Sequence, residues 1–255
     1  MFSRKTPPFL NRRGSILLLF GVAFRPLTFL AEEKINMRAI LLVALATAGA
    51  CAHALVLDDF TDGNINDKIF GTSTNATYTA ATVPGGFRYV WHTITSNPFS
   101  LSHSTTVTNG IFSTSSKNEV DADTTIAWGV DSTGSVNLAN DLNANLSSFT
   151  QFKFNVLSND NPATITMVVR SGSTTAMSAA KAVMPNMVST SQTVTFDFSE
   201  FTGINFADVD TIIANINTST SGDLVLDSFE AVPEPGTMIA LGLGAAALAA
   251  RRRKA

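Results

Sequence analysis

The side chains that catalysis usually requires are sparse in this 255-residue chain. His92 and His103 are the only histidines after residue 54, and the single cysteine, Cys51, lies in an apolar stretch near the N-terminus. The chain contains no HExxH, G-x-S-x-G or Walker-type sequence, and no pair of carboxylates stands out by its spacing. We therefore expect a protein without catalytic residues. A polysaccharide hydrolase is the alternative, because acidic residues are plentiful and two carboxylates suffice for that reaction.

Aromatic side chains offer a second kind of chemistry, because flat rings can stack on the apolar faces of sugars. The candidates for such a platform are Tyr89, Trp91 and Trp128, with Phe99 as a further ring. Tyr89 and Trp91 are two residues apart, so they share one face of an extended strand. The same spacing is typical of a core pair, and aromatic residues on strands often fill cores. Both interpretations stay open at this point.

Short strand-like runs between turn signals must position these residues. In Phe152–Leu157 and Gln192–Phe198, apolar residues alternate with polar ones, which indicates half-buried antiparallel strands. Turn residues separate the runs, which predicts an all-β sandwich. One helical turn is expected within Phe206–Ile213. Strands are expected at Phe87–Ile94, Thr124–Val130, Phe152–Leu157, Thr164–Arg170, Gln192–Phe198 and Asp223–Val232.

The order of these segments resembles the jelly-roll, galactose-binding-like domains found among carbohydrate-binding modules. The residues that carry the resemblance are 57–63 at the start, 142–157 in the middle and 224–229 at the end. The resemblance implies an antiparallel jelly-roll β-sandwich over residues 55–231. It also implies that the first and last strands lie side by side, and that carbohydrate is a candidate ligand.

The same resemblance implies a calcium ion beside the first and last strands, which is the only cofactor expected. Asp58, Asp59 and Asp62 would come from the first segment and Asp227 from the last. Calcium prefers several oxygen ligands, and Gly63 permits a tight loop next to them. The alternative is that these aspartates cap turns or face solvent.

The charge of the chain is divided into three parts. Residues 1–54 carry seven Lys and Arg and two acidic residues, whereas residues 55–235 carry 18 acidic and six basic residues. The last five residues carry four basic side chains. Basic ends around an acidic middle are typical of an exported chain, because Lys and Arg stay on the cytoplasmic side. The acidic middle excludes nucleic acid as a partner, since binding it requires a basic surface.

Residues 37–54 have the features of a signal peptide. Arg38 gives a short positive region, and residues 39–50 are apolar, so we expect an N-terminal signal helix there. Ala52 and Ala54 form the A-x-A pattern that signal peptidase requires, so we expect cleavage after Ala54. The mature chain would then contain no cysteine and no disulfide.

Residues 1–36 are unusual because a signal peptide should begin at the N-terminus. We expect a misassigned extension, since Glu32-Glu33 can be encoded by a sequence that contains a ribosome-binding site just before Met37. The alternative is a long basic region ahead of the signal. A lipoprotein is a further alternative, because residues 48–51 resemble a lipobox that ends in Cys51.

The C-terminal residues 232–255 combine three features in order. Val232-Pro233-Glu234-Pro235 cannot lie inside a helix and should be extended. The 14 uncharged residues Thr237–Ala250 follow, and as a helix they would be about 21 Å long, which is short for a membrane span of about 30 Å. The chain then ends in the basic residues Arg251, Arg252, Arg253 and Lys254, which should remain in the cytoplasm.

This order of features resembles the PEP-CTERM sorting signal. The resemblance implies that exosortase, a membrane-embedded protease, recognises and removes the tail, and that the bacterium makes exopolysaccharide. The expected partners are signal peptidase, exosortase, the inner membrane and exopolysaccharide. The protein would be held in the inner membrane by a short C-terminal helix and then move to the cell surface or outside. The alternative is an ordinary C-terminal anchor that happens to contain this sequence.

Overall fold

The computed structural model describes residues 53–135, 141–186 and 191–233. The expected extension, the signal segment up to Ala52 and the tail from Glu234 onward lie outside these ranges. So do Pro235, the basic cluster Arg251–Lys254 and the two terminal helices expected from the sequence. Within the described ranges, no helix has the length and apolar character needed to cross a membrane.

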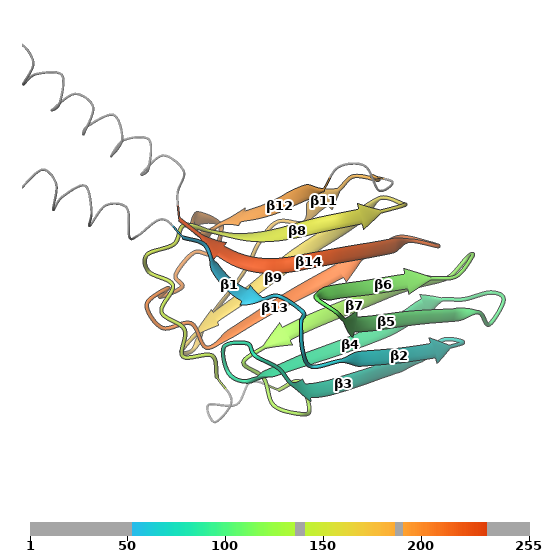
Figure 1. Ribbon diagram of the computed structural model, residues 1–255, viewed down its shortest axis with the longest axis horizontal. Coiled ribbons are helices and arrows are strands. Elements are labelled where there is room, and N and C mark those ends of the chain that lie inside the picture. Colours follow the sequence, from blue (N-terminus) through green and yellow to red (C-terminus); the bar gives the residue numbers. More distant parts are fainter. Residues whose placement is uncertain (1–52, 136–140, 187–190, 234–255) are drawn as a thin grey trace, which may run out of the picture.

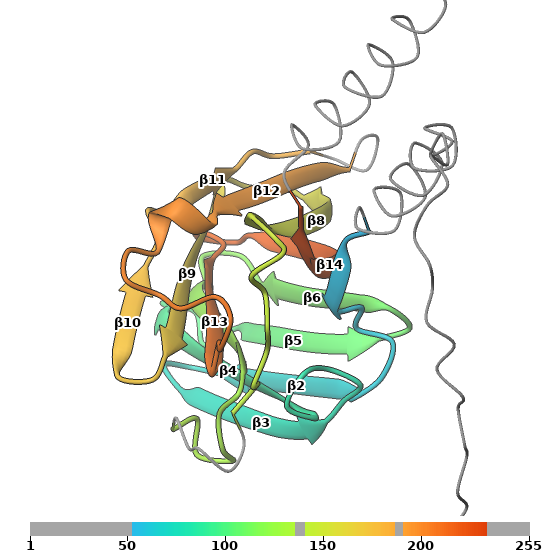
Figure 2. The ribbon, with the colours of Figure 1, turned by 90° about the vertical axis from the view of Figure 1, so that its left-hand side faces the viewer.

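Two antiparallel sheets of seven strands face each other (Figures 1 and 2). In sheet A the order is β12-β8-β14-β6-β5-β2, and β1 pairs with β14; in sheet B it is β10-β9-β13-β7-β4-β3, and β11 pairs with β9. Sheet A contains β1 (Leu55–Asp58), β2 (Ile65–Phe70), β5 (Ser102–Thr108), β6 (Ile111–Ser116), β8 (Gln151–Asn159), β12 (Gln192–Asp197) and β14 (Asp223–Val232). Sheet B contains β3 (Thr74–Ala80), β4 (Phe87–Ser96), β7 (Asp121–Trp128), β9 (Ala163–Ser171), β10 (Thr174–Met177), β11 (Lys181–Val183) and β13 (Thr211–Asn217).

The predicted all-β, antiparallel sandwich is confirmed. Each strand expected from alternation in the sequence overlaps an observed one, at β4, β7, β8, β9, β12 and β14. The helical turn expected within Phe206–Ile213 is wrong. A short 3-10 turn, η1, lies instead at Phe198–Glu200, and residues 211–217 form β13 because Ile212, Ala214 and Ile216 all face the core.

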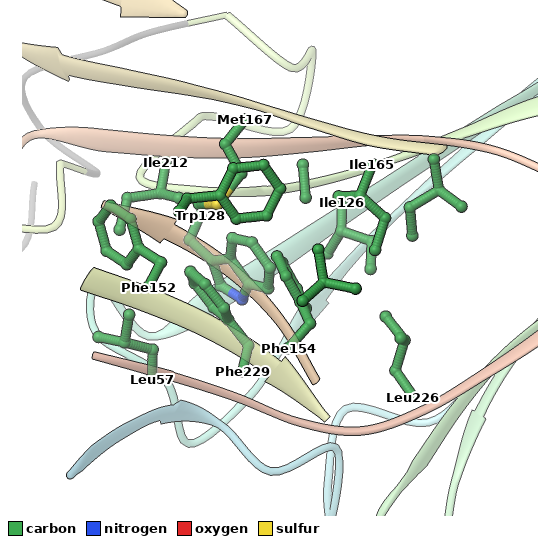
Figure 3. Packing of buried hydrophobic residues seen from close by; sticks show 14 of the residues in the cluster. Leu57, Ile126, Trp128, Phe152, Phe154, Ile165, Met167, Ile212, Leu226 and Phe229 are labelled. Atoms are coloured by element: carbon green, nitrogen blue, oxygen red, sulfur yellow. The ribbon is translucent and has the colours of Figure 1, made fainter. Parts of the chain in front are cut away.

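Aromatic rings pack against one another between the two sheets (Figure 3). Phe229 of β14 stacks on Trp128 of β7 and on Phe154 of β8, with ring centroids 4.7 and 4.5 Å apart. Phe152 lies against the same ring at 5.6 Å. Phe229 is fully buried on a central strand of sheet A, and its ring contacts side chains of both sheets. These contacts help to fix the distance between the sheets.

Polar side chains are also buried between the sheets. His92 of β4 and His103 of β5 belong to different sheets, yet their ring centroids lie 5.2 Å apart and both rings are buried. His92 Nε2 is 3.1 Å from Asp67 Oδ2, and His92 Nδ1 is 3.0 Å from Thr105 Oγ1. His103 Nδ1 is 2.9 Å from Ser116 Oγ. Burial lowers the pKa values of both rings, that of His103 to about 4, although Asp67 opposes the shift.

Candidate functional site

Two rows of polar side chains cross the outer face of sheet B, with a tryptophan at the end of one row. Paired residues of neighbouring antiparallel strands lie on the same face of a sheet, so the register determines each row. The first row runs Trp91, Thr125, Asn215 and Thr166 across β4, β7, β13 and β9. The second row lies two residues away on each of the same strands and consists of Thr93, Asp123, Asn217 and Thr164.

These eight residues line a groove of about 500 Å³, which we call the Trp91 groove. Trp91 is 44% exposed, so part of its indole ring is available to a ligand in the groove. Hydrogen bonds fix the polar groups beside it. Thr125 donates to Asn215 Oδ1 over 2.9 Å, and Asn217 donates to Asp123 Oδ1 over 2.7 Å. The groove therefore combines one flat ring with preset hydroxyl, amide and carboxylate groups across about 14 Å of sheet.

One further aromatic ring, that of Tyr89, continues this face beyond Trp91. Tyr89 lies two residues before Trp91 on β4, on the same face, and is half-buried. A Cβ on Gly134 would lie 2.8 Å from the Tyr89 ring, so a loop covers this ring closely and needs glycine there. Burial raises the pKa of Tyr89, and the nearby Asp131 adds to the shift. Tyr89 is therefore partly covered by this loop, and it is not among the residues that line the Trp91 groove.

The expectation that Trp128 belongs to an exposed platform is wrong. Its side chain is only 2% exposed and stacks on Phe229 in the core (Figure 3). Its indole Nε1 donates a 2.8 Å hydrogen bond to Asp58 Oδ2, which satisfies its polar atom inside the sandwich. Phe99 is exposed but lies in the loop between β4 and β5, outside the groove.

The structure does not assemble the four aspartates expected to hold calcium. β1 does pair with β14, as expected, but Asp58 points inward and its carboxylate is fully used. It accepts hydrogen bonds from Trp128, from the Phe60 backbone at 2.9 Å and from two nitrogens of the buried Arg88, one of them Nε at 2.6 Å.

The other three aspartates have local roles or face solvent. Asp59 accepts hydrogen bonds from Thr61, and Asp62 accepts from the backbone and side chain of Thr82, while Asp227 is exposed. In the described ranges, no group of three or more His, Cys, Asp or Glu residues is placed to hold a metal ion. The alternative interpretation, in which these residues cap turns or face solvent, describes Asp59, Asp62 and Asp227; the buried ion pair of Asp58 was not expected.

The two ends of the described chain meet at one end of the sandwich (Figure 1). Leu55 pairs with Ala231, and the exposed Ala54 comes directly before β1. On its other edge, β14 pairs with β8 up to Val232 opposite Gln151, and Thr150 N donates to Val232 O over 3.0 Å. Val232 is therefore fixed in the sheet, and Pro233 is the first residue beyond the strand.

Residues 231–254 match the family model of the PEP-CTERM protein-sorting motif. The chain carries a PEP-CTERM motif. This motif indicates export, with the C-terminus anchored in the membrane until exosortase removes it. Its first two residues, Ala231 and Val232, also belong to β14, so the PEP-CTERM motif and the folded domain share residues.

Solved structures with a related arrangement of strands include carbohydrate-binding modules. A family 11 module from Clostridium thermocellum, in complex with a β-1,3-1,4-mixed-linked tetrasaccharide, has 14% identity over 71% of this chain and 95% of its own, with a TM-score of 0.35. The solution structure of a family 11 module gives 12% identity, 72% and 96% coverage and a TM-score of 0.38.

A family 29 module in complex with mannohexaose has 10% identity over 66% of this chain and 91% of its own, with a TM-score of 0.30. Similarity at this level adds nothing to the geometry of the Trp91 groove. No curated protein sequence matches the chain significantly.

The polar residues of the groove were not expected from the sequence, although a signal for them was present. Thr125 and Asp123 alternate with buried residues on β7, and Asn215 and Asn217 do the same on β13. Small polar residues at every second position mark a solvent-facing row. Their assembly with Trp91 depends on the pairing of four strands, which the sequence alone does not supply.

Proposed function

We propose that this chain is an exported, non-enzymatic protein of the bacterial cell envelope or matrix that binds polysaccharide through the Trp91 groove. The PEP-CTERM motif supports its transient anchoring in the inner membrane and its release by exosortase. The β-sandwich would then hold the released protein in the exopolysaccharide outside the cell. Signal peptidase acts first in this scheme, after Ala54.

The exposure of Trp91 beside two rows of fixed polar groups carries the sugar-binding part of the proposal. A sugar ring presents apolar C–H faces and a belt of hydroxyl groups, so it needs a flat apolar surface with donors and acceptors around it. Trp91 supplies the surface, and Thr125, Asn215 and Asp123 supply donors and acceptors. Ligand sites in general combine apolar area with a few fixed polar groups in this way.

A non-catalytic role is supported by the presence of a single carboxylate in the lining of the groove. Asp123 is the only acidic residue among those that line it. Hydrolysis of a glycosidic bond by the usual mechanism requires two carboxyl groups on either side of the bond. The groove residues can therefore bind and orient a glycan, but they do not provide the acid–base pair that would cut it.

A binding assay with a Trp91 variant tests the sugar-binding proposal. The processed protein should bind one or more polysaccharides on a glycan array, and Trp91→Ala should weaken that binding about tenfold or more. Phe99→Ala removes an exposed ring outside the groove and should bind like the wild type. Equal binding by wild type and the Trp91→Ala variant would show that the groove is not the site.

The sorting proposal is tested in a bacterium that encodes exosortase. Pulse-labelled protein should lose its C-terminal tail, and Pro233→Ala combined with Glu234→Ala should keep it. Loss of the tail at the same rate in both proteins, or in a strain without exosortase, would contradict the proposal.

A further inference from the structure

The PEP-CTERM motif begins inside the folded domain, which leaves almost no spacer before the membrane segment. Ala231 and Val232 are buried residues of β14; Ala231 pairs with both β1 and β8, and Val232 pairs with β8. Only four residues, 233–236, separate Val232 from the apolar stretch that starts at Thr237. Four residues reach at most about 14 Å even when fully extended. A membrane-embedded protease that cuts this segment must therefore work against the end of the sandwich.

A groove lies at that end, directly beside the exit of the tail. Its lining includes Thr150 and Gln151, which contact Val232 through the sheet. The groove has a volume of about 760 Å³. Its apolar floor is formed by Phe149, Phe198, Ile204 and Phe206, and we call it the exit groove.

Packing and hydrogen bonds hold the side chains of the exit groove in fixed positions. Phe198 and Phe206 stack with ring centroids 3.8 Å apart, and Phe198 also packs on the core residue Phe152 at 4.7 Å. Phe198 N donates a 2.7 Å hydrogen bond to Thr150 O, which connects η1 to the start of β8. On the same end of the sandwich, Leu55 and Val56 of β1 are 39% and 50% exposed.

We propose that the exit groove is the surface on which exosortase docks when it cuts the PEP-CTERM tail. The inference rests on the proposed processing by exosortase and adds the surface of the folded domain that takes part. The short spacer brings the protease to the groove, and an apolar floor with a polar rim is the composition of a protein-docking surface. Recognition then depends on the domain as well as on the tail, so a tail attached to another protein would be cut less efficiently.

Substitutions on the rim of the groove test the proposal in the full chain. Ser147 and Ala207 are exposed rim residues, and neither contributes an aromatic ring to the floor. In an exosortase-bearing bacterium, the pair Ser147→Arg and Ala207→Arg should slow tail removal about tenfold. The pair Ser147→Glu and Ala207→Glu should slow it similarly, because either charge opposes docking on an apolar floor. Thr72→Arg, in the β2–β3 turn at the other end of the sandwich, should have no effect (Figure 1).

A flexible insertion separates a docking defect from a defect in export or folding. About ten Gly and Ser residues between Val232 and Pro233 would add a mean reach of about 17 Å. With this insertion, wild-type and rim-substituted chains should lose their tails at the same rate. A rim pair that remains slow relative to the wild type after the insertion would overturn the proposal. Tail removal at the wild-type rate in the uninserted rim variants would also overturn it.

Two further outcomes have distinct meanings. If the unsubstituted chain keeps its tail in this host, processing by exosortase itself is wrong, and the docking proposal fails with it. If processed wild-type protein binds neutral phospholipid vesicles and the rim variants do not, the groove contacts lipid, which overturns docking of the protease. The docking proposal alone is wrong when wild type and rim variants are cut equally.

Discussion

Arg88 and Asp58 form an ion pair that is buried between the two sheets, although 30 residues separate them in the chain. Arg88 also donates to the backbone oxygens of Asp62 and Gly63 at 3.0 and 3.2 Å. Gly63 has a φ of 64°, and a Cβ there would lie 2.9 Å from Ala80 O and from Ala81 Cβ and 3.0 Å from Arg88 Nη1. The loop after β1 is therefore shaped around the guanidinium group.

Removing one partner of this pair should be strongly destabilising. Arg88→Ala leaves the Asp58 carboxylate buried without its charge partner, which typically costs about 3–5 kcal/mol. The free energy of unfolding, measured by urea denaturation of the processed protein, should fall by this amount. Lys117→Ala removes an exposed positive charge and should change the same quantity by less than about 0.5 kcal/mol. A loss of less than about 1 kcal/mol for Arg88→Ala would contradict the buried geometry.

Acid should destabilise the sandwich through its two buried histidines. The pKa of His103 is lowered from 6.5 to about 4, because burial and the neighbouring His92 oppose its charge, while Asp67 favours it. The unfolded chain therefore binds a proton more readily than the folded one. The contribution of the neutral His103 to the free energy of unfolding is fully present above pH 6.5. It is lost as the pH falls toward 4, which lowers the free energy of unfolding by about 3 kcal/mol.

The contribution of His103 is measured by urea denaturation at several pH values. His103→Gln keeps a donor and an acceptor but cannot gain a proton in this range. Its stability should depend less on pH between 6.5 and 4 than that of the wild type. Identical pH dependence in the two proteins would show that His103 does not titrate on unfolding.

The Trp91 groove should favour neutral polysaccharides over acidic ones. Asp123 contributes a carboxylate, and no Lys or Arg is among the residues that line the groove. Uronic acid polymers should therefore bind more weakly, and Asp123→Asn should improve their binding about two- to fivefold. The difference should shrink at high salt, because screening weakens exposed charge interactions. Titration calorimetry with a neutral and an acidic polymer checks this; stronger binding of the acidic polymer by the wild type would contradict it.

Calcium should not stabilise the protein through Asp58, Asp59, Asp62 and Asp227. Asp58 is occupied by Arg88 and Trp128, so the aspartates proposed from the sequence do not form a ligand set. The melting temperature of the processed protein should be the same with added calcium and with a chelator, since a ligand raises it only when it binds the folded state. A calcium-dependent increase that is lost in Asp59→Asn or Asp227→Asn would restore the earlier expectation.

The sequence predicts the sandwich well because apolar and polar residues alternate along several of its strands. Phe152, Phe154 and Val156 all face the core, as their period of two indicates. The adjacency of the first and last strands also follows the resemblance, and β1 pairs with β14. Several Ser- and Thr-rich strands, such as β5 and β6, were not predicted. Their buried residues include Thr105 and Thr114, which carry no hydrophobic signal.

Trp91 shows that the local sequence pattern does not always predict which face of a strand is buried. On β4, Val90 and His92 face inward while Trp91 faces solvent. The polar histidine is therefore buried and the apolar tryptophan next to it is exposed, which is the reverse of what polarity alone predicts. His92 is accommodated inside because Asp67 and Thr105 lie next to it. Those partners come from other strands, so the orientation of β4 depends on contacts that are distant in the sequence.

The position of β14 determines how the protein responds to tension while it is tethered by its tail. β14 is a central strand, held by β8 on one edge and by β6 and then β1 on the other. The tail continues directly from Val232, so a pull along the axis of β14 would enter the sheet through this strand. The backbone hydrogen bonds, which lie across the strand, are then loaded together in shear and not broken one after another. Under such a pull the backbone hydrogen bonds of β14 would resist together, and removal of the chain beyond Val232 would leave every strand of the sheet in place.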